Sequence, residues 1–231
     1  MGNRPKIIDL THDIRTGMMV YPGDPGVEVR ESLTHESAFC HVDRLDIGSH
    51  TGTHIDAPYH FLADGKRITD FPVSQFVGEG IVINLTGKGA GEAITEADLQ
   101  PLHEQITAGD FVLLRTGWCE KFGTDEYLDH PYVSGDAAEL LVKWGVRIVA
   151  VDFLNVDSTR LEQWDAHPVL LSSDVLIVEN IANSLALDPE KRYLFSFAPL
   201  KVVGSDGAPV RAFAIELRGG EMADLCNPGT N

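Results

Sequence analysis

Four ionisable side chains lie close together in the segment SHTGTHIDAPYHF, which runs over residues 49–61. They are His50, His54, Asp56 and His60. Imidazole nitrogens combined with a carboxylate suit Zn²⁺, Mn²⁺ or Fe²⁺. Four such groups would be costly to bury without a partner. The cluster therefore predicts a metal site, in preference to a set of surface histidines or hydrogen-bonded core histidines.

The spacing of these residues favours an extended backbone over a helix. In a helix, His50 and His54 would share a face, as in the H-E-x-x-H zinc motif. However, the Thr-Gly-Thr between them forms helices poorly, and Pro58 would end a helix before His60. Every gap is even, so an extended chain points the side chains to one side. Four residues of straight strand cover about 13 Å, so we expect a bend at Gly52 that draws the first two histidines together.

Four aliphatic runs predict the strands that must position this segment. They are GIVINL at 80–85, DFVLLRT at 110–116, RIVAVDF at 147–153 and DVLIVEN at 174–180. Runs that are apolar on both faces are typical of strands buried within a sheet. A hairpin is also predicted over 200–217, turning on Ser205–Ala208.

Two helices are predicted between these strands. The first covers 95–106, with Thr95 as its N-cap and Asp98 three residues later in a variant of the capping box. The second starts at Ser134 and ends at Gly145. Alternating strands and helices, together with a hairpin, predict an α/β fold. We expect residues 1–231 to form a single mixed-sheet domain with flanking helices, because no linker or change of composition divides them.

The charge and cysteine content limit the possible partners and location. The net charge of −17 would repel phosphate backbones, so we expect no nucleic-acid binding. The apolar runs are too short to span a bilayer, and we expect no membrane attachment. Three widely spaced cysteines (Cys40, Cys119 and Cys226) form no disulfide framework or zinc knuckle, which favours a cytoplasmic location.

The histidine segment resembles a known signature. HTGTHIDAPYH is similar to H-x-G-T-H-x-D-x-P-x-H of the cyclase-like metal-dependent hydrolases, a family that includes bacterial kynurenine formamidase (arylformamidase) and isatin hydrolase. IDLTHDIRTGMMVYPGDP resembles the family's opening strand and its aromatic-Pro-Gly-Asp turn. LLRTGW, AVDFLNVD, AHPVLL, IVENIAN and PLKVVGSDGAPVRAFA resemble its later blocks in the same order. The resemblance covers most of the chain and implies the swivelling β/β/α fold of that family.

The resemblance also implies the ligands of one or two divalent ions, most simply Zn²⁺, with Mn²⁺ as the alternative. His50, His54 and Asp56 would hold the first ion. Asp56 would also reach a second ion, completed by His167 and by Glu179 as a second bridging carboxylate. By itself His167 would pass for a loop histidine, whereas Glu179 ends an aliphatic strand and calls for a cation or a hydrogen-bond partner.

The resemblance assigns two further roles outside the metal ligands. His60 would stay free of metal and act as the proton donor and acceptor, as the ordinary imidazole pKa near 6.5 permits. Tyr21 occupies the turn position where formamidases of the tryptophan pathway have tryptophan, and it would stack on a flat substrate or pack on the core. The other histidines (His12, His35, His41, His103 and His130) we interpret as ordinary surface or core residues.

These features together predict hydrolysis of the C–N bond of an amide, aryl formamide or cyclic amide by metal-activated water. The substrate would be a small molecule, and the resemblance implies a homodimer or homotetramer. Two alternatives remain open, namely a lactone hydrolase or cyclase on the same metal centre, and a metal- or ligand-binding protein without catalysis. No G-x-S-x-G motif occurs, which disfavours a serine nucleophile.

Overall fold

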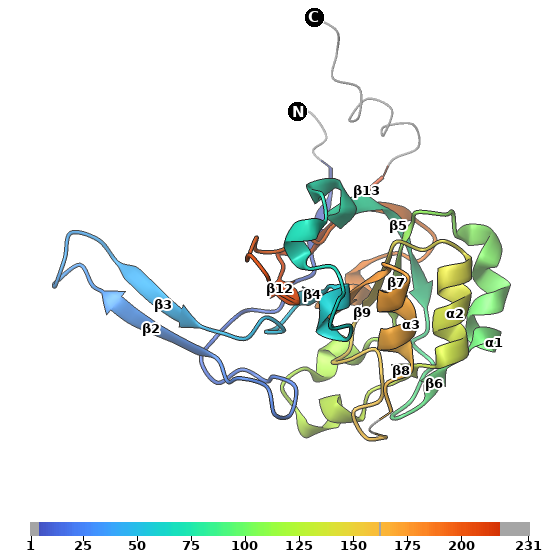
Figure 1. Ribbon diagram of the computed structural model, residues 1–231, viewed down its shortest axis with the longest axis horizontal. Coiled ribbons are helices and arrows are strands. Elements are labelled where there is room, and N and C mark those ends of the chain that lie inside the picture. The colour runs from blue at the N-terminus through green and yellow to red at the C-terminus, as the bar shows by residue number, and fades with distance from the viewer. Residues whose placement is uncertain (1–4, 162, 218–231) are drawn as a thin grey trace, which may run out of the picture.

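A curled, mixed sheet organises the residues that the computed structural model describes, which are 5–161 and 163–217 (Figure 1). Within them, nine strands pair in the order β1-β13-β11-β5-β7-β9-β10-β4-β12. The strands of this sheet are β1 (Ile7–Asp9), β4 (His54–Asp56), β5 (Val77–Asn84), β7 (Phe111–Arg115), β9 (Ile148–Val151), β10 (Leu176–Glu179), β11 (Arg192–Ser196), β12 (Gly207–Pro209) and β13 (Phe213–Glu216). Because β1 pairs with β13, the two ends of the described chain meet.

The four predicted strands form the parallel centre of this sheet. β5, β7, β9 and β10 run parallel in that spatial order. Every residue of β7, β9 and β10 is buried, as expected for strands covered on both faces. Alternate residues divide between two apolar clusters, so that Val112 faces one cluster and Leu113 faces the other. The sequence prediction of these strands is confirmed.

Three α-helices occur in the described part of the chain, and they lie on one side of the parallel strands in Figure 1. They are α1 (Glu96–Leu99), α2 (Gly135–Lys143) and α3 (Ala166–Ser172). α2 follows the prediction, and Gly145 ends its last turn with a φ of 73°. No helix among the described residues is long and apolar enough to cross a membrane.

The predicted helix over 95–106 is wrong in its second half. Its start is correct, since the backbone N–H of Thr95 donates to the Asp98 carboxylate at 2.7 Å. α1 ends at Leu99, and residues Gln100–Gln105 form a 3₁₀ helix instead. Pro101 explains the change, because it lacks the N–H that an α-helix needs and its ring crowds the preceding turn. The other 3₁₀ segments are Pro58–His60, Ile68–Asp70, Val73–Phe76, Trp118–Lys121, Asp125–Asp129 and Ser184–Ala186.

The predicted hairpin over 200–217 is also wrong in most of its pairing. Only a single bridge joins its two arms, between Pro199 and Val210. The turn lies earlier than predicted, around Gly204, whose φ is 80°. β12 pairs with β4 beside the histidine segment, whereas β13 pairs with β11 and β1 at the other end of the strand order. Strand patterning could not reveal these distant partners.

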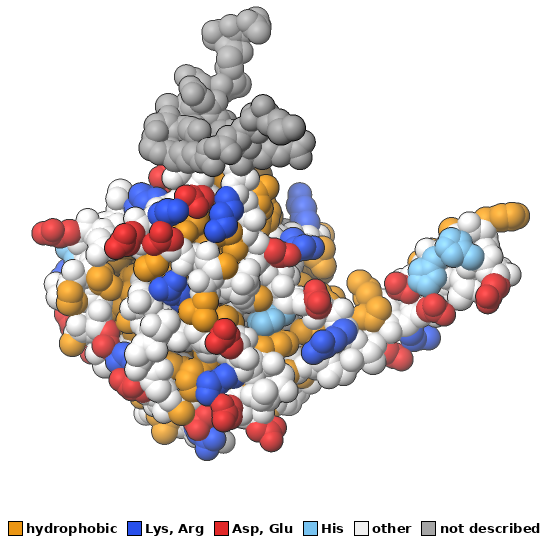
Figure 2. Space-filling model, turned by 180° about the vertical axis from the view of Figure 1, so that it is seen from behind, with side chains coloured by type: hydrophobic (Ala, Val, Ile, Leu, Met, Phe, Trp, Pro, Cys, Tyr) orange, Lys and Arg blue, Asp and Glu red, His pale blue; other side chains and the backbone are white. Residues whose placement is uncertain are grey.

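A two-stranded arm extends from the body of the molecule, as Figure 1 shows. It consists of β2 (Glu28–Leu33) and β3 (Val42–Asp46), paired antiparallel with a bulge after Glu31. Seen from behind, the arm carries histidine side chains and a hydrophobic tip (Figure 2). The arm joins the Tyr21 turn to the His50 segment, so both of its ends lie next to predicted site residues. A further two-stranded pair, β6 (Ala93–Ile94) and β8 (Tyr132–Val133), lies apart from the main sheet.

Candidate metal centre

The histidine segment is bent at Gly52, as predicted, but it is extended only over His54–Asp56 and forms a turn around His50. Gly52 has a φ of 62°, in the left-handed region that favours glycine. The rings of His50 and His54 consequently lie 5.0 Å apart between centroids. His54–Asp56 form the buried strand β4, and Pro58–His60 then make a 3₁₀ turn. The bend, rather than a straight strand, brings the first two histidines together.

Asp56 is the centre of the cluster. Its side chain is completely buried, and its Oδ1 lies 2.7 Å from Nδ1 of His50 and 3.3 Å from Nε2 of His54. Its Oδ2 lies 3.5 Å from Nε2 of His167 and has no hydrogen-bond partner. A buried carboxylate oxygen without a partner is costly unless a cation binds it. The lack of a hydrogen-bond partner for this buried oxygen is the clearest sign of a metal site.

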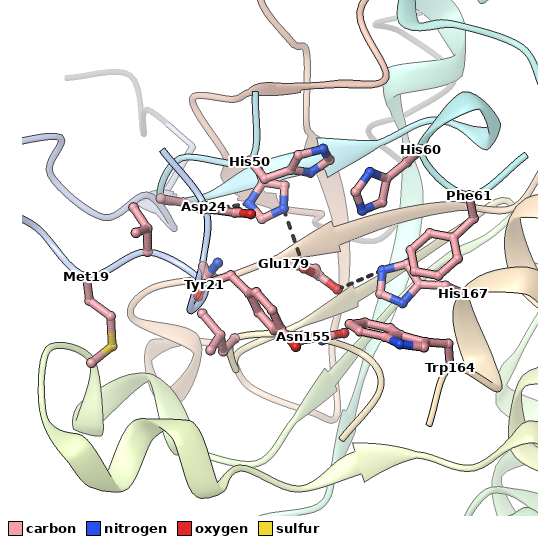
Figure 3. A pocket seen from close by; sticks show the side chains of 15 residues that line it. Met19, Tyr21, Asp24, His50, His60, Phe61, Asn155, Trp164, His167 and Glu179 are labelled. Atoms are coloured by element: carbon pink, nitrogen blue, oxygen red, sulfur yellow. Dashed lines mark hydrogen bonds and ion pairs between the residues drawn. The ribbon is translucent and has the colours of Figure 1, made fainter. Parts of the chain in front are cut away.

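Glu179 completes the cluster from the neighbouring strand. In the pairing of β10 with β4, Glu179 lies opposite His54. Its two carboxylate oxygens lie 3.4 Å from Nε2 of His54 and 3.4 Å from Nε2 of His167. Figure 3 shows these contacts as dashed lines that meet at Glu179. Glu179 therefore lies between the two histidines, in the position that the resemblance implied.

His54 and His167 are each oriented by an acceptor outside the cluster. Nδ1 of His54 donates to the carbonyl of Gly52 at 2.8 Å. Nδ1 of His167 donates to the carboxylate of Asp157 at 2.7 Å. Each contact fixes the ring so that Nε2 faces the carboxylates and is the nitrogen available to a cation, which is the arrangement that metal-binding histidines usually have.

Asp157 has a second role that sequence reasoning missed. Besides His167, it accepts hydrogen bonds from the backbone N–H groups of Asp165, Ala166 and His167 at the start of α3. The same carboxylate thus holds the first turn of the helix and the ring that the helix carries. AVDFLNVD showed an acidic residue after a strand, but only the tertiary structure relates it to His167.

Three overlapping sets of donor atoms result from this geometry among the described residues. Two of them share Asp56 and contain the predicted ligands, with His50, His54 and Asp56 in one and Asp56, His167 and Glu179 in the other. The third comprises His50, His60 and Asp206. Within each set the donor atoms lie within 4.8 Å of one another. The structure therefore brings together all of the predicted metal ligands, and the nitrogen and oxygen donors fit Zn²⁺ or Mn²⁺.

Protonation of the cluster reflects competition between burial and the carboxylates. Burial is the largest influence and opposes charging of the histidines, but Asp56 outweighs it and raises the pKa of His50 to about 9 and that of His54 to about 10. Burial and the charge of Asp56 raise the pKa of Glu179, but hydrogen bonds from His167 and His54 bring it down to about 2. At neutral pH the metal-free cluster therefore contains imidazolium and carboxylate groups.

We expect metal affinity to rise with pH at every pH below about 9. A cation binds neutral imidazole, so it must displace the protons that these raised pKa values retain. The expected gain is about tenfold per pH unit for each proton released. Isothermal titration of metal-free protein with Zn²⁺ in buffers of different ionisation enthalpy measures that release. An affinity that stays constant between pH 6 and 8, with no proton released, would contradict the proposed ligands.

Gly52→Ala is expected to destabilise the metal-free protein by about 1–2 kcal/mol, because a left-handed φ is unfavourable for a residue with a Cβ. That Cβ would also lie 3.2 Å from Cε of Met18. Urea unfolding measures the effect. Gly87→Ala is the matched control, since Gly87 is exposed and an added Cβ would meet nothing within 4 Å. Equal unfolding midpoints for the two variants would show that the bend is not strained.

His60 lies beside the cluster and outside the two donor sets that share Asp56, and it belongs to the third set with His50 and Asp206. Its ring centroid is 4.0 Å from that of His50 and 5.8 Å from that of His167. Nδ1 of His60 lies 3.2 Å from Oδ2 of Asp206. The side chain is partly exposed and lines the pocket. Its position beside the predicted ligands is the one that the resemblance implied, and its role in proton transfer remains a prediction.

A cavity of about 250 Å³ opens above the cluster. Aromatic side chains form much of its wall, as Figure 3 shows for Tyr21, Phe61 and Trp164. The Phe61 ring stacks on His167 at 4.4 Å, and the Trp164 ring lies 6.1 Å from that of Tyr21. Trp164 belongs to the 159–168 segment that follows Asp157, and sequence reasoning assigned it no role. Asp24 and Asn155 are polar residues of the same lining.

The remaining histidines lie in ordinary environments. His12 stacks on Phe122, and burial lowers its pKa to about 4. His130 is buried and contacts the carbonyl of Pro131, and His103 stacks on Trp144. His35 and His41 lie on the exposed arm. None belongs to the donor sets found among the described residues.

Comparison with known proteins agrees with this geometry. Residues 8–158 match a family described as putative cyclase. A kynurenine formamidase of Bacillus cereus is 32% identical over 209 residues, which are 89% of this chain and 95% of that protein. A solved structure described as a potential metal-dependent hydrolase with cyclase activity is 31% identical, with a TM-score of 0.79 over 93% of this chain and 100% of that one. Isatin hydrolase A from Labrenzia aggregata shares the fold, with a TM-score of 0.83, 23% identity, and coverage of 91% and 93%.

Proposed function

Since the chain belongs to the family described as putative cyclase, we propose that it is a metal-dependent hydrolase of non-peptide C–N bonds, acting on a small aromatic formamide or cyclic amide. A relative at 32% identity is named kynurenine formamidase, and the isatin hydrolases have the same fold. The single observation that carries the proposal is the buried Asp56 carboxylate, which is shared by two sets of donors and has one oxygen without a hydrogen-bond partner.

The proposed ligands divide between two cation positions. His50, His54 and Asp56 would hold one divalent ion, and Asp56, His167 and Glu179 would hold the other. Zn²⁺ is the proposed ion, with Mn²⁺ as the alternative. A divalent ion supplies two effects when bound, because it lowers the pKa of a water ligand towards 7 and polarises a substrate carbonyl.

His60 is the proposed proton-transfer residue. It would take a proton from the attacking water and return it to the departing nitrogen. The hydroxyl of that water is added to the carbonyl carbon, the C–N bond breaks, and the products are a carboxylic acid and an amine. The support is positional, because the ring lines the pocket beside the two donor sets that share Asp56 and is a member of neither of those two.

The aromatic wall supports a flat substrate. Rings of Tyr21, Phe61 and Trp164 surround the space above the cluster, and flat rings stack favourably on such side chains. We expect Tyr21→Ala to raise KM about tenfold for an aromatic amide and to change kcat little, because stacking binds substrate and transition state alike. Tyr21→Phe is the control and should keep the KM of the wild type. A KM that is unchanged in Tyr21→Ala would remove Tyr21 from the substrate site.

A substrate panel tests the proposed reaction. Zinc-loaded protein would be assayed with N-formylkynurenine, isatin and a simple lactone. Hydrolysis of either nitrogen compound is the expected result. Hydrolysis of the lactone alone would indicate a lactone hydrolase. Stoichiometric metal without hydrolysis of any of the three would favour a binding protein and would contradict the proposal.

The arm supports a proposed homodimer or homotetramer. A two-stranded hairpin is at best marginally stable alone in water, yet this one exposes Leu33, Val42 and Leu45, and Phe39 at its tip is fully exposed. A second copy of the chain would cover this surface. Light scattering should give two or four times the chain mass of 25.2 kDa, and a monomer would contradict the proposal.

We also propose a cytoplasmic location, in keeping with the free thiols of Cys40 and Cys119; Cys226 lies outside the described residues.

A further inference from the structure

Asp206 lies next to the metal centre and has no role in the reaction as described so far. It directly precedes β12, and its backbone is fixed because the N–H of Ala57 donates to the Asp206 carbonyl at 2.8 Å. The following residue, Gly207, lies opposite Asp56 in the pairing of β12 with β4. The last segment of the sheet therefore delivers a carboxylate to the side of the cluster opposite β10.

One oxygen of Asp206 accepts hydrogen bonds from two imidazoles. Its Oδ2 lies 3.0 Å from Nε2 of His50 and 3.2 Å from Nδ1 of His60. The backbone next to this contact lies close to the same ring and leaves no room for a side chain, because a Cβ on Gly207 would lie 2.8 Å from Cε1 of His50. The two histidines come from the bent segment and the 3₁₀ turn, so Asp206 joins separate parts of the site.

The contact with His50 completes a pattern. His54 and His167 each donate one ring nitrogen to a fixed acceptor and turn the other towards the buried carboxylates. His50 also has one ring nitrogen on an acceptor and the other on a buried carboxylate, but the two nitrogens exchange roles. Its Nε2 faces Asp206, and its Nδ1 faces Asp56 at 2.7 Å. Acceptors of this kind orient metal-binding imidazoles. Of the three acceptors, Asp206 also contacts a second histidine, His60, which is not a proposed metal ligand.

We propose that Asp206 is a positioning residue that couples His50, a proposed metal ligand, to His60, the proposed proton carrier. By accepting the Nδ1 proton of His60, it leaves the Nε2 lone pair available to the pocket. The same carboxylate holds the ring of His50 with Nδ1 towards Asp56. The part of this inference that concerns proton transfer rests on the proposed function, whereas the orientation of the two rings does not.

The negative charge of Asp206 predicts which kinetic constant depends on this residue. When His60 carries the proton taken from water it is an imidazolium, and a carboxylate 3.2 Å away stabilises that form. Substrate binding places no charge on His60, so loss of the carboxylate should reduce kcat and leave KM nearly unchanged.

A double-mutant cycle tests the kinetic part. Asp206→Asn is expected to reduce kcat by about 10–100-fold, with KM within about threefold of the wild type. In a His60→Ala background the same substitution should reduce kcat by a clearly smaller factor, because only the contact with His50 then remains. Asp64→Asn, an exposed carboxylate on the loop after His60, is the control. An equal loss in both backgrounds, or a loss confined to KM, would overturn the proposal.

A measurement without substrate tests the orientation. In zinc-loaded protein labelled with ¹⁵N-histidine, long-range ¹H–¹⁵N spectra should show His60 as the Nδ1–H tautomer. Asp206→Ala should shift it to the Nε2–H tautomer at unchanged metal content. An Nε2–H tautomer in the wild type would overturn the proposal. Loss of the bound metal ion from Asp206→Ala, with the ion retained in the wild type, would also overturn it, since Asp206 would then be a ligand. If the wild type hydrolyses no amide while the Nδ1–H tautomer is present, the proposed function fails and the positioning contact stands.

Discussion

Asp56→Asn should abolish both metal binding and catalysis. Asp56 is completely buried and is shared by the two donor sets, so the substitution removes a charged ligand from each. Changes to residues that merely orient metal ligands reduce metal affinity or activity about 10–100-fold. Loss of a shared ligand should reduce kcat/KM at least about 1000-fold. The amide is nearly the same size as the carboxylate, which limits disturbance of packing.

Metal analysis and steady-state rates measure this effect together. Asp9→Asn is the matched control, because Asp9 is an exposed carboxylate that pairs with Arg211 at the edge of β1. The control should retain full metal content and activity. Wild-type metal content in Asp56→Asn would show that the ligands are elsewhere.

His60→Ala should separate catalysis from metal binding. General acid–base catalysis by a positioned side chain contributes about 10²–10⁴-fold, so we expect kcat to fall by that factor. Metal content should stay at the wild-type level, because His60 lies outside both proposed ligand sets.

The control for this prediction is His41→Ala, on the exposed arm, where the imidazole contacts Asp43. The variant should match the wild type in both measurements. Full activity in His60→Ala would exclude the proposed proton transfer, and loss of metal would make His60 a ligand.

The local part of the site was accessible from the sequence. Even spacing, a glycine and a proline sufficed to predict a bent, extended segment, and the left-handed φ of Gly52 confirms the bend. The aliphatic runs likewise predicted the parallel strands, because strands buried on both faces need apolar residues throughout. Where a single residue changes local geometry, as Pro101 does after α1, the pattern of apolar positions was misleading.

Distant contacts were not accessible in the same way. His167 and Glu179 entered through resemblance to a family, since nothing in their neighbourhoods indicates that they converge on Asp56. Asp157 and Asp206 were missed, because each acts on a histidine across a tertiary contact. The pairing of β12 with β4 places Asp206 there, and hairpin patterning had assigned that segment to a different partner. The arm was missed too, because its strands are exposed and carry little apolar pattern.

Removal and restoration of metal test the central claim most directly. Hydrolysis of N-formylkynurenine and isatin would be followed before chelation, after chelation verified by elemental analysis, and after addition of Zn²⁺ or Mn²⁺. We expect activity to disappear with the metal and to return when one or two equivalents per chain are restored. An unchanged rate in protein verified to be free of metal would contradict this expectation.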